Sequence, residues 1–226
     1  AVRAGMRAAL VRTGRFPPGA KWPIGLPTPT WDHDDLTTLL LTCEIDGRHM
    51  TDADFASFFV QLVTAGNDTT RTAISHGVNL LSLNPDQRAI WQADVDGITN
   101  SAVEEIVRAA SPVTFMRRTA TRDVTLAGQD FHEGDKFVMF YGAANRDPRV
   151  FERPEVFDVR RQPNPHVGFG GPGPHFCLGA NLARRELTVM FDTIRERVPS
   201  LRITGEPDYL QSAFINGIKR LQCAWD

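Results

Sequence analysis

The segment best suited to chemistry is a loop rich in glycine and proline that contains a single cysteine, Cys177. Residues 164–186 read NPHVGFGGPGPHFCLGANLARRE, so the cysteine stands directly before a stretch with a helical pattern. Glycines let the backbone approach a ligand closely, and both loop N–H groups and a helix N-terminus favour the negative charge of a thiolate. A buried structural thiol is the usual interpretation of a lone cysteine. The surrounding sequence favours a thiolate ligand instead.

The same loop also fits a nucleotide-binding pattern, because Gly168, Gly170 and Gly173 are spaced as G-x-G-x-x-G. That pattern binds a dinucleotide when it follows a core strand and opens a helix. Here prolines precede the glycines and interrupt them. A dinucleotide-binding oxidoreductase is therefore a distant alternative.

A second group of reactive residue types, AGNDTT at residues 65–70, lies inside a long helical pattern. Glycine and adjacent threonines are poor helix formers, and a threonine hydroxyl that bonds back to a carbonyl can open the helix and admit water. We therefore expect a local groove around Gly66, Asp68 and Thr69. The alternative, a polar patch on a solvated helix face, is weakened because these residues interrupt an otherwise apolar helix.

Two further motifs place charges at informative positions. Glu105 and Arg108 are three residues apart, so they share one helix face where they can pair, and Arg161 follows later in the chain. Such a pair on an exposed helix is common and contributes little stability, so its meaning depends on its order among the other motifs. Arg117 and Arg118 lie in a strand-like segment, and only one of them can point at a given partner because a strand alternates faces.

In this order, the motifs resemble those of the C-terminal half of cytochrome P-450 enzymes. The segment from Phe169 to Gly179 is similar to the haem-binding loop of that family, in which a cysteine thiolate is the proximal ligand of the iron. Gly173, His175, Cys177 and Gly179 match the family pattern. Phe169 is displaced by one residue, which indicates an insertion in the loop.

The resemblance implies a role for each motif. It implies haem b as the cofactor, with Cys177 as the axial ligand of the iron, and Asp68 and Thr69 as catalytic residues that relay protons to dioxygen. The cofactor-binding residues are expected to be Cys177, His175, Arg118, Phe169, Gly66, Gly173 and Gly179, with Arg117 as the rival of Arg118 for a haem propionate. A structural triad near the haem loop is expected from Glu105, Arg108 and Arg161.

The resemblance also implies the reaction. Thiolate ligation favours cleavage of the O–O bond, so a monooxygenase is expected, with electrons delivered from NAD(P)H by a ferredoxin reductase and a ferredoxin. Arg184 and Arg185 are candidates for the docking face of that partner, or simply a solvated helix face. A truncated haem-binding fragment without turnover is the alternative.

The motifs look closest to those of bacterial steroid side-chain and methyl-branched lipid hydroxylases, so an apolar small molecule of that class is the expected substrate. Ordinary core packing is an equal alternative for each of the apolar residues expected to line its pocket. These residues are Phe58, Leu62, Val63, Val113, Phe115, Met116, Phe214 and Ile215.

The elements that must position these motifs are mainly helices with small antiparallel strands, as in the C-terminal half of the cytochrome P-450 fold. Residues 1–35 are expected to be an irregular proline-rich lead-in. Residues 36–226 are expected to be the C-terminal haem-binding part of one domain whose N-terminal half is absent, since the chain begins at Ala1.

The patterns also predict individual elements. They are a long central helix that follows the N-cap residue Thr51 and reaches Leu83, a helix that begins at Pro85, a helix from about Asn100 to Ser111, short strands between Val113 and Phe140, a final helix that begins near Leu178, and a last hairpin within residues 214–225. The final helix is expected to bury a face formed by Ala183, Leu187, Met190, Phe191, Ile194 and Val198.

Composition excludes several classes of function. The formal net charge is −2, so there is no basic excess to bind nucleic acid. No stretch approaches the roughly 18 apolar residues of a membrane span. Three cysteines are too few for a disulfide framework, which favours a reducing, cytoplasmic setting, and Cys43 and Cys223 are expected to be packing residues. The histidines other than His175 show no ligand spacing.

Overall fold

The computed structural model describes residue 42, residues 44–45 and residues 47–226. The expected proline-rich lead-in and Cys43 lie outside the described residues. The chain divides into two units, Ala1–Thr64 and Ala65–Asp226. In the first unit, β1 (Glu44–Ile45) and β2 (Arg48–His49) form a short antiparallel pair.

The long central helix has the predicted bounds: α3 spans Asp52–Leu83, 32 residues. It begins where predicted because the Thr51 hydroxyl oxygen accepts a hydrogen bond from the Asp54 N–H at 3.2 Å, which satisfies a free donor of the first turn. Asp52 and Asp54 lie in that turn, where the helix dipole favours acidic side chains. The helix ends before Asn84 and Pro85, as predicted.

Two shorter helices follow, and the start of the second differs from the prediction. Helix α4 (Pro85–Ala93) begins at its proline, as predicted. Helix α5 (Val95–Ala110) begins about five residues earlier than expected, because Asp94 caps it by accepting a hydrogen bond from the Gly97 N–H at 3.0 Å. It ends as predicted at Ser111, whose φ of 40° stops the helix.

The last helix, α7 (Ala180–Arg197), begins two residues after Leu178. Leu187 and Phe191 are buried on it as predicted. The prediction for Met190 was wrong, because its side chain is 39% exposed and the neighbouring Val189 is buried instead. The buried face is therefore rotated toward Val189, and Met190 lies beyond its edge.

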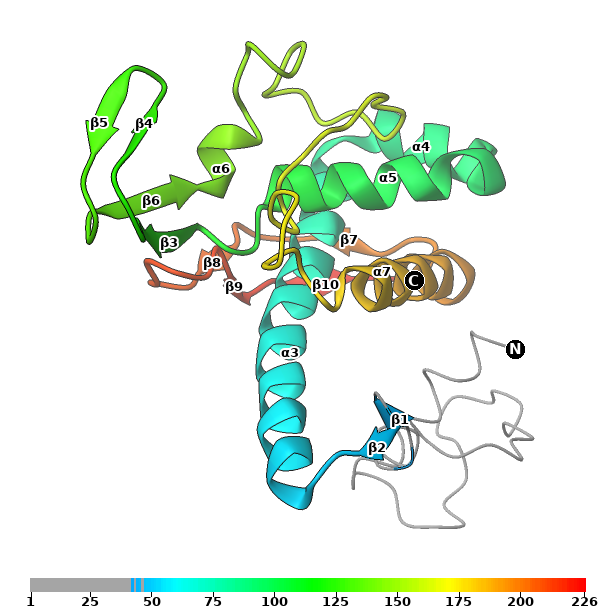
Figure 1. The fold of residues 1–226 in the computed structure, drawn as a ribbon. Coiled ribbons are helices and arrows are strands. Elements are labelled where there is room, and N and C mark those ends of the chain that lie inside the picture. The colour runs from blue at the N-terminus through cyan, green and yellow to red at the C-terminus, as the bar shows by residue number, and fades with distance from the viewer. Residues whose placement is uncertain (1–41, 43, 46) are drawn as a thin grey trace. The chain divides into compact units, whose positions relative to one another are not determined.

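The core of the second unit forms where α3, α5 and α7 meet (Figure 1). Gly77 on α3 permits this close approach, because an added Cβ would overlap Phe191 Cζ and lie 3.1 Å from Ile106 Cδ1. The buried apolar side chains of this core are Ala73, Trp91, Ile98, Ala102, Val103, Ile106, Val107, Phe157, Val159, Leu187 and Phe191.

The strands form small antiparallel pairs, as predicted between Val113 and Phe140. Strand β3 (Phe115–Thr119) pairs with β6 (Lys136–Phe140), and β4 (Val124–Leu126) pairs with β5 (Gln129–Phe131). Ala127 and Gly128 connect β4 to β5 with φ of 51° and 78°, the positive values that a tight hairpin turn requires. A four-residue helix, α6 (Tyr141–Ala144), follows β6.

The predicted C-terminal hairpin was wrong. Strand β9 (Ile218–Arg220) pairs with β8 (Asp208–Tyr209), and β10 (Cys223–Ala224) pairs with β7 (Arg202–Ile203). The two strands of the segment thus pair with earlier partners rather than with each other. Long-range contacts of this kind leave no local turn signal in the sequence.

Candidate functional site

Cys177 lies at the end of an irregular loop, three residues before α7 begins. Its backbone N–H donates to Phe169 O at 2.9 Å, and the Phe176 N–H donates to Gly173 O at 3.0 Å, so the loop folds back on itself. Gly170 and Gly173 have φ of 88° and 134°, which side chains rarely allow. The resulting loop leaves Cys177 as a free, exposed cysteine.

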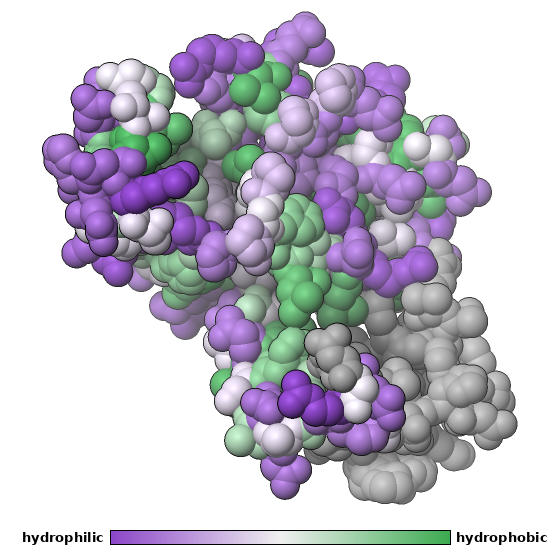
Figure 2. Space-filling view, viewed as in Figure 1, coloured by the Kyte–Doolittle hydropathy of each residue, from purple (hydrophilic) through white to green (hydrophobic). Residues whose placement is uncertain are grey.

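The surface around this cysteine is apolar and open. Leu178 is 79% exposed and Phe176 is also exposed. A Cβ built on Gly171, Gly173 or Gly179 would meet no atom within 4 Å. Figure 2 shows that apolar surface gathers over the middle of the second unit, where the loop meets α7 in Figure 1. Exposed apolar surface beside a reactive side chain is typical of a binding site.

The dinucleotide interpretation of the loop is not supported. No strand precedes Gly168 between residues 145 and 167 of the described chain, and α7 begins only at Ala180, well after the glycines. The loop therefore lacks the strand and the helix that the dinucleotide motif requires.

The structure brings Glu105, Arg108 and Arg161 together. Glu105 and Arg108 on α5 are 0% and 1% exposed, and Glu105 accepts two hydrogen bonds from Arg108, at 2.7 and 2.8 Å. Arg161 Nε donates to the same carboxylate at 3.0 Å, and Asn164 Nδ2 donates at 3.1 Å. The Asp158 N–H completes the set at 3.0 Å.

Both arginines also fix the irregular segment between α6 and the cysteine loop. Arg108 Nη1 donates to the carbonyls of Asn145 and Pro154, at 2.8 Å each, and Arg161 Nη2 donates to Val156 O at 2.6 Å. Hydrogen bonds from these two arginines thus hold the segment that leads to Cys177, which contains no helix or strand. Buried charges of this kind are tolerated only when every partner is present.

The motif on α3 is helical throughout, so the predicted opening of the helix at residues 65–70 is not seen. The Thr69 hydroxyl donates to Ala65 O at 2.8 Å, as expected, but the helix absorbs this bond without a break. Asp68 is half-buried and accepts a hydrogen bond from Arg71 at 3.1 Å. A Cβ on Gly66 would meet no atom within 4 Å, so the helix surface is open there.

Glu186 on α7 is a titratable residue near this motif that sequence analysis did not single out. Burial raises the pKa of its carboxyl group, and a hydrogen bond with Thr70 partly opposes that effect. The contact joins α7 to the turn of α3 that holds Asp68 and Thr69. Position alone gave no signal for it, because ARRE reads as a charged helix face.

Arg117 and Arg118, the two candidates to bind a haem propionate, differ in burial. Arg118 is half-buried on β3 and donates to Arg117 O at 2.9 Å, whereas Arg117 is exposed. Among the residues that the structure describes, neither has a carboxylate within ion-pair distance. His175 is exposed in the cysteine loop, two residues before Cys177.

The predicted pocket residues fall into two groups. Phe58, Leu62 and Val63 lie on α3 in the first unit. In the second unit the chain segments around residues 113–116 and 214–215 lie together, since Val113 bridges Ile215 and the Phe115 and Phe214 rings are 6.1 Å apart. Met116 is half-buried on β3.

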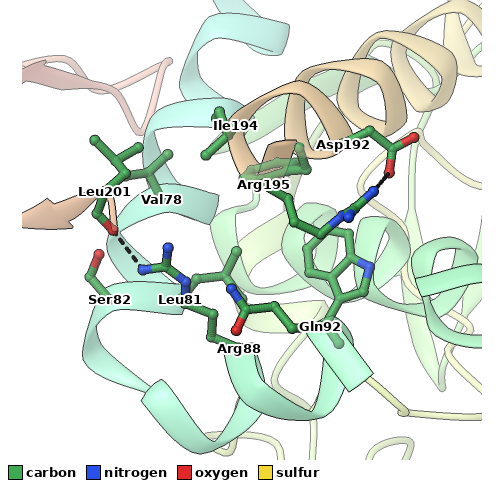
Figure 3. A pocket seen from close by; sticks show the side chains of 11 residues that line it. Val78, Leu81, Ser82, Arg88, Gln92, Asp192, Ile194, Arg195 and Leu201 are labelled. Carbon is green, nitrogen blue, oxygen red and sulfur yellow. Dashed lines mark hydrogen bonds and ion pairs between the residues drawn. The ribbon is translucent and has the colours of Figure 1, made fainter. Parts of the chain in front are cut away.

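A separate pocket lies away from the cysteine loop (Figure 3). Arg88 reaches across it to donate to Leu201 O at 2.6 Å. Apolar and polar side chains of α3, α4 and α7 line it together with Leu201. It brings together none of the residues predicted to do chemistry.

The chemistry of the candidate residues fits haem, the cofactor that the resemblance to cytochrome P-450 enzymes implies. The free thiol supplies one soft ligand, the open glycines leave space for a planar group, and Arg118 and His175 offer donors to its carboxylates. No group of three or more metal-ligating side chains occurs in the described part of the chain, so a bare ion has no comparable site there. In the same part, no helix is both long and apolar enough to cross a membrane.

Comparison with known proteins agrees with this geometry. The cytochrome P-450 family model matches residues 27–197. A methyl-branched lipid omega-hydroxylase of Mycobacterium bovis is 54% identical over 193 residues, which cover 85% of this chain and 45% of that protein. A steroid C26-monooxygenase of Mycolicibacterium smegmatis is 44% identical over 189 residues, which cover 84% and 44%. The chain spans about half the length of these relatives.

Solved structures give the same result. A Mycobacterium marinum cytochrome P-450 in complex with pseudoionone has a TM-score of 0.78 and 47% identity, covering 86% of this chain and 47% of that chain. A Bacillus megaterium cytochrome P-450 in complex with testosterone has a TM-score of 0.79 and 35% identity, covering 86% and 54%.

Proposed function

Because this chain belongs to the cytochrome P-450 family, we propose that the protein it forms is a haem-dependent monooxygenase that hydroxylates an apolar substrate. One oxygen atom of dioxygen enters a C–H bond of the substrate, and the other leaves as water with two protons and two electrons. The electrons come from NAD(P)H through a ferredoxin reductase and a ferredoxin.

The observation that carries the proposal is the free, exposed thiol of Cys177 at the end of a loop that its own backbone bonds hold in place. Haem, when bound, supplies dioxygen activation, and thiolate ligation favours cleavage of the O–O bond. The protein residues contribute the sulfur ligand, the partners of the propionates and a path for protons. We assign the propionate contacts to Arg118 and His175, and prefer Arg118 over the exposed Arg117.

We assign the proton path to Asp68 and Thr69. Thr69 donates its hydroxyl proton to Ala65 O, so its oxygen can accept a hydrogen bond from water or a reacting group. Asp68 is half-buried and bonds to the exposed Arg71, so its carboxylate lies between solvent and the helix surface. A carboxylate in this position can exchange protons with solvent and pass them inward.

The substrate class we propose is a steroid side chain or a methyl-branched lipid. The phenylalanines around Val113 and Ile215 provide the apolar contacts that such a molecule needs, and relatives at 54% and 44% identity are named for those two activities. We place the enzyme in the cytoplasm, because three cysteines in the sequence are too few for a disulfide framework.

The test is the spectrum of the haem-loaded chain after reduction and addition of carbon monoxide. We expect the red-shifted Soret band of thiolate ligation, and we expect Cys177→Ala to abolish it while Cys223→Ala leaves it unchanged. A folded chain that binds haem without this band would contradict the proposal. Turnover is then tested with sterols and branched fatty acids in the presence of a ferredoxin and its reductase.

One alternative is favoured by a specific observation. The chain spans 45% of its 54%-identical relative, which favours a haem-binding fragment without turnover as the alternative. In that case the thiolate band appears, but no hydroxylated product forms with any substrate supplied. Substrate oxidation would then be seen only with a protein as long as these relatives.

A further inference from the structure

Glu104, the residue before the buried Glu105, bonds to both segments that flank the cysteine loop. Its Oε2 lies 2.8 Å from His166 Nε2, eleven residues before Cys177. Its Oε1 and Oε2 accept hydrogen bonds from Arg184 Nε and Nη2, at 2.5 and 3.0 Å, seven residues after Cys177. One carboxylate on α5 therefore ties the entry of the loop to the first turns of α7.

The hydrogen bonds show which groups donate to the Glu104 carboxylate on each side. The Gly168 N–H donates to His166 Nδ1 at 3.1 Å, so Nε2 of the ring carries the proton that Glu104 accepts. Arg184 binds Glu104 through two parallel hydrogen bonds, the arrangement that gives an arginine–carboxylate pair its strength and direction.

Both partners of Glu104 also touch Phe169. The Arg184 guanidinium lies over the Phe169 ring, 4.4 Å from its centroid, and the His166 and Phe169 ring centroids are 5.8 Å apart. Phe169 O in turn accepts the hydrogen bond from the Cys177 N–H at 2.9 Å. The contacts thus run in sequence from Glu104 through its two partners to Phe169 and then to the backbone of Cys177.

We propose that Glu104 is a positioning residue for the cysteine ligand: through His166 and Arg184 it holds Phe169, and hence the loop that presents the Cys177 sulfur. The proposal rests on the proposed function only in taking Cys177 as the haem ligand. It also explains why Arg184 is a poor candidate for a free docking cation, since Glu104 occupies its guanidinium group, whereas Arg185 is exposed.

The charge state of Glu104 supports this role. Burial alone would raise the pKa of its carboxyl group, but the hydrogen bonds from His166 and Arg184 outweigh that effect and lower the pKa to about 2. The bond to Glu104 raises the pKa of Arg184 in return. Both groups therefore stay charged across the range of pH in which a folded enzyme is studied.

The first measurement is amide hydrogen exchange of the haem-free full chain. Glu104→Gln keeps the shape of the side chain but removes its charge, so we expect the Cys177 amide to exchange roughly tenfold faster, with α5 and α7 unchanged. Glu155→Gln is the matched control, because Glu155 pairs with Arg146 at 3.6 Å on a 78% exposed side chain. Its exchange should equal that of the native chain.

The second measurement is spectroscopic. In the haem-loaded chain, we expect Glu104→Gln to reduce the share of the reduced, carbon monoxide-bound protein that shows the thiolate Soret band, and Glu155→Gln to leave it unchanged. Arg184→Gln should also reduce this share, and the double variant should lose less than the sum of the two single losses, because the Glu104–Arg184 contact is common to both. Two unrelated losses of stability would add instead.

The outcomes separate the two proposals. Native-like Cys177 exchange and a native-like spectrum in Glu104→Gln overturn the positioning role. Faster exchange throughout the core, rather than in the loop, also overturns it, since Glu104 would then be only a stabilising residue. A native chain that binds haem without the thiolate band overturns the proposed function instead, while the exchange of the Cys177 amide still decides whether Glu104 holds the loop.

Discussion

Glu105 is a fully buried charged residue, and it depends on its hydrogen-bond partners. Its carboxylate has no exposed surface and receives hydrogen bonds from two arginines, an asparagine and one backbone N–H. Removing one charge from a buried network leaves its partners without compensation, which costs far more than breaking an exposed pair. The spacing of Glu105 and Arg108 predicts their contact, but nothing local indicates that Asn164 also reaches this carboxylate.

We therefore expect Glu105→Gln to lower the free energy of unfolding by about 3–5 kcal/mol, because it leaves Arg108 and Arg161 partly unpaired in the interior. Urea unfolding of the haem-free chain measures this loss. Glu155→Gln, which removes an exposed pair, should change the free energy by less than about 1 kcal/mol. Equal effects of the two substitutions would mean that the buried network adds nothing to stability.

At the scale of elements, α3 contains two glycines in opposite surroundings. Gly66 faces open space, whereas Gly77 lies against Phe191 and Ile106 in the core. Phe191 has little room to move, since it also packs against Trp91 with ring centroids 5.5 Å apart. Gly77 therefore matters for packing, whereas a side chain at position 66 would meet no neighbouring atom.

The matched substitutions Gly66→Ala and Gly77→Ala test this difference. Alanine at position 66 should raise the free energy of unfolding by about 0.5–1 kcal/mol, since a helix interior favours alanine over glycine. Alanine at position 77 gains the same helix preference but overpacks the core, so it should be less stable than the first variant by about 1–3 kcal/mol. Similar urea midpoints for the two variants would contradict the packing seen at Gly77.

The elements also show which parts of the fold a sequence can predict. The bounds of α3 follow from Thr51 and Pro85, which act within one turn of the helix. The start of α5 was missed because Asp94, its cap, directly follows α4. The partners of β9 and β10 were missed because they lie 9 to 22 residues earlier in the chain, outside the segment itself. Local signals were sufficient only where local contacts decide the structure.

The residues of the candidate site also differ in whether their signals are local in the sequence. Cys177 is predicted to be a ligand from its glycine-rich loop and the helix that follows, and both of these signals are local in the sequence. Glu104 could not be predicted, because its partners His166 and Arg184 come from segments 62 and 80 residues away. A single sequence records the residues of such a cluster without recording that they meet.

On the scale of the whole molecule, two half-buried or buried groups of the second unit make stability depend on pH. Burial lowers the pKa of His76 from its ordinary value of 6.5, and nearby Arg146 lowers it further, although the hydrogen bond to Asn216 O opposes this. Glu104 has its pKa lowered from 4.5 to about 2. In both cases the unfolded chain binds protons more readily than the folded one.

The sign follows for each group. The contribution of His76 is present above pH 6.5 and is lost as the pH falls below that value, because the unfolded chain takes up the proton first. The contribution of Glu104 is present above pH 4.5 and is lost as the pH falls from 4.5 toward about 2. Stability should therefore decline in two steps on acidification.

Urea unfolding of the haem-free chain from pH 7.5 downward measures both steps. His76→Asn keeps a donor for Asn216 O but cannot titrate, so it should flatten the decline below pH 6.5, whereas His132→Asn, at an exposed position, should leave the native profile. Glu104→Gln should flatten the decline below pH 4.5, and Glu155→Gln should not. A native profile that stays level from pH 7.5 to 5.5 would show that His76 is not held neutral by its surroundings. A decline below pH 4.5 that persists in Glu104→Gln would assign the acid step to other carboxyl groups and leave Glu104 without the charge that its two contacts require.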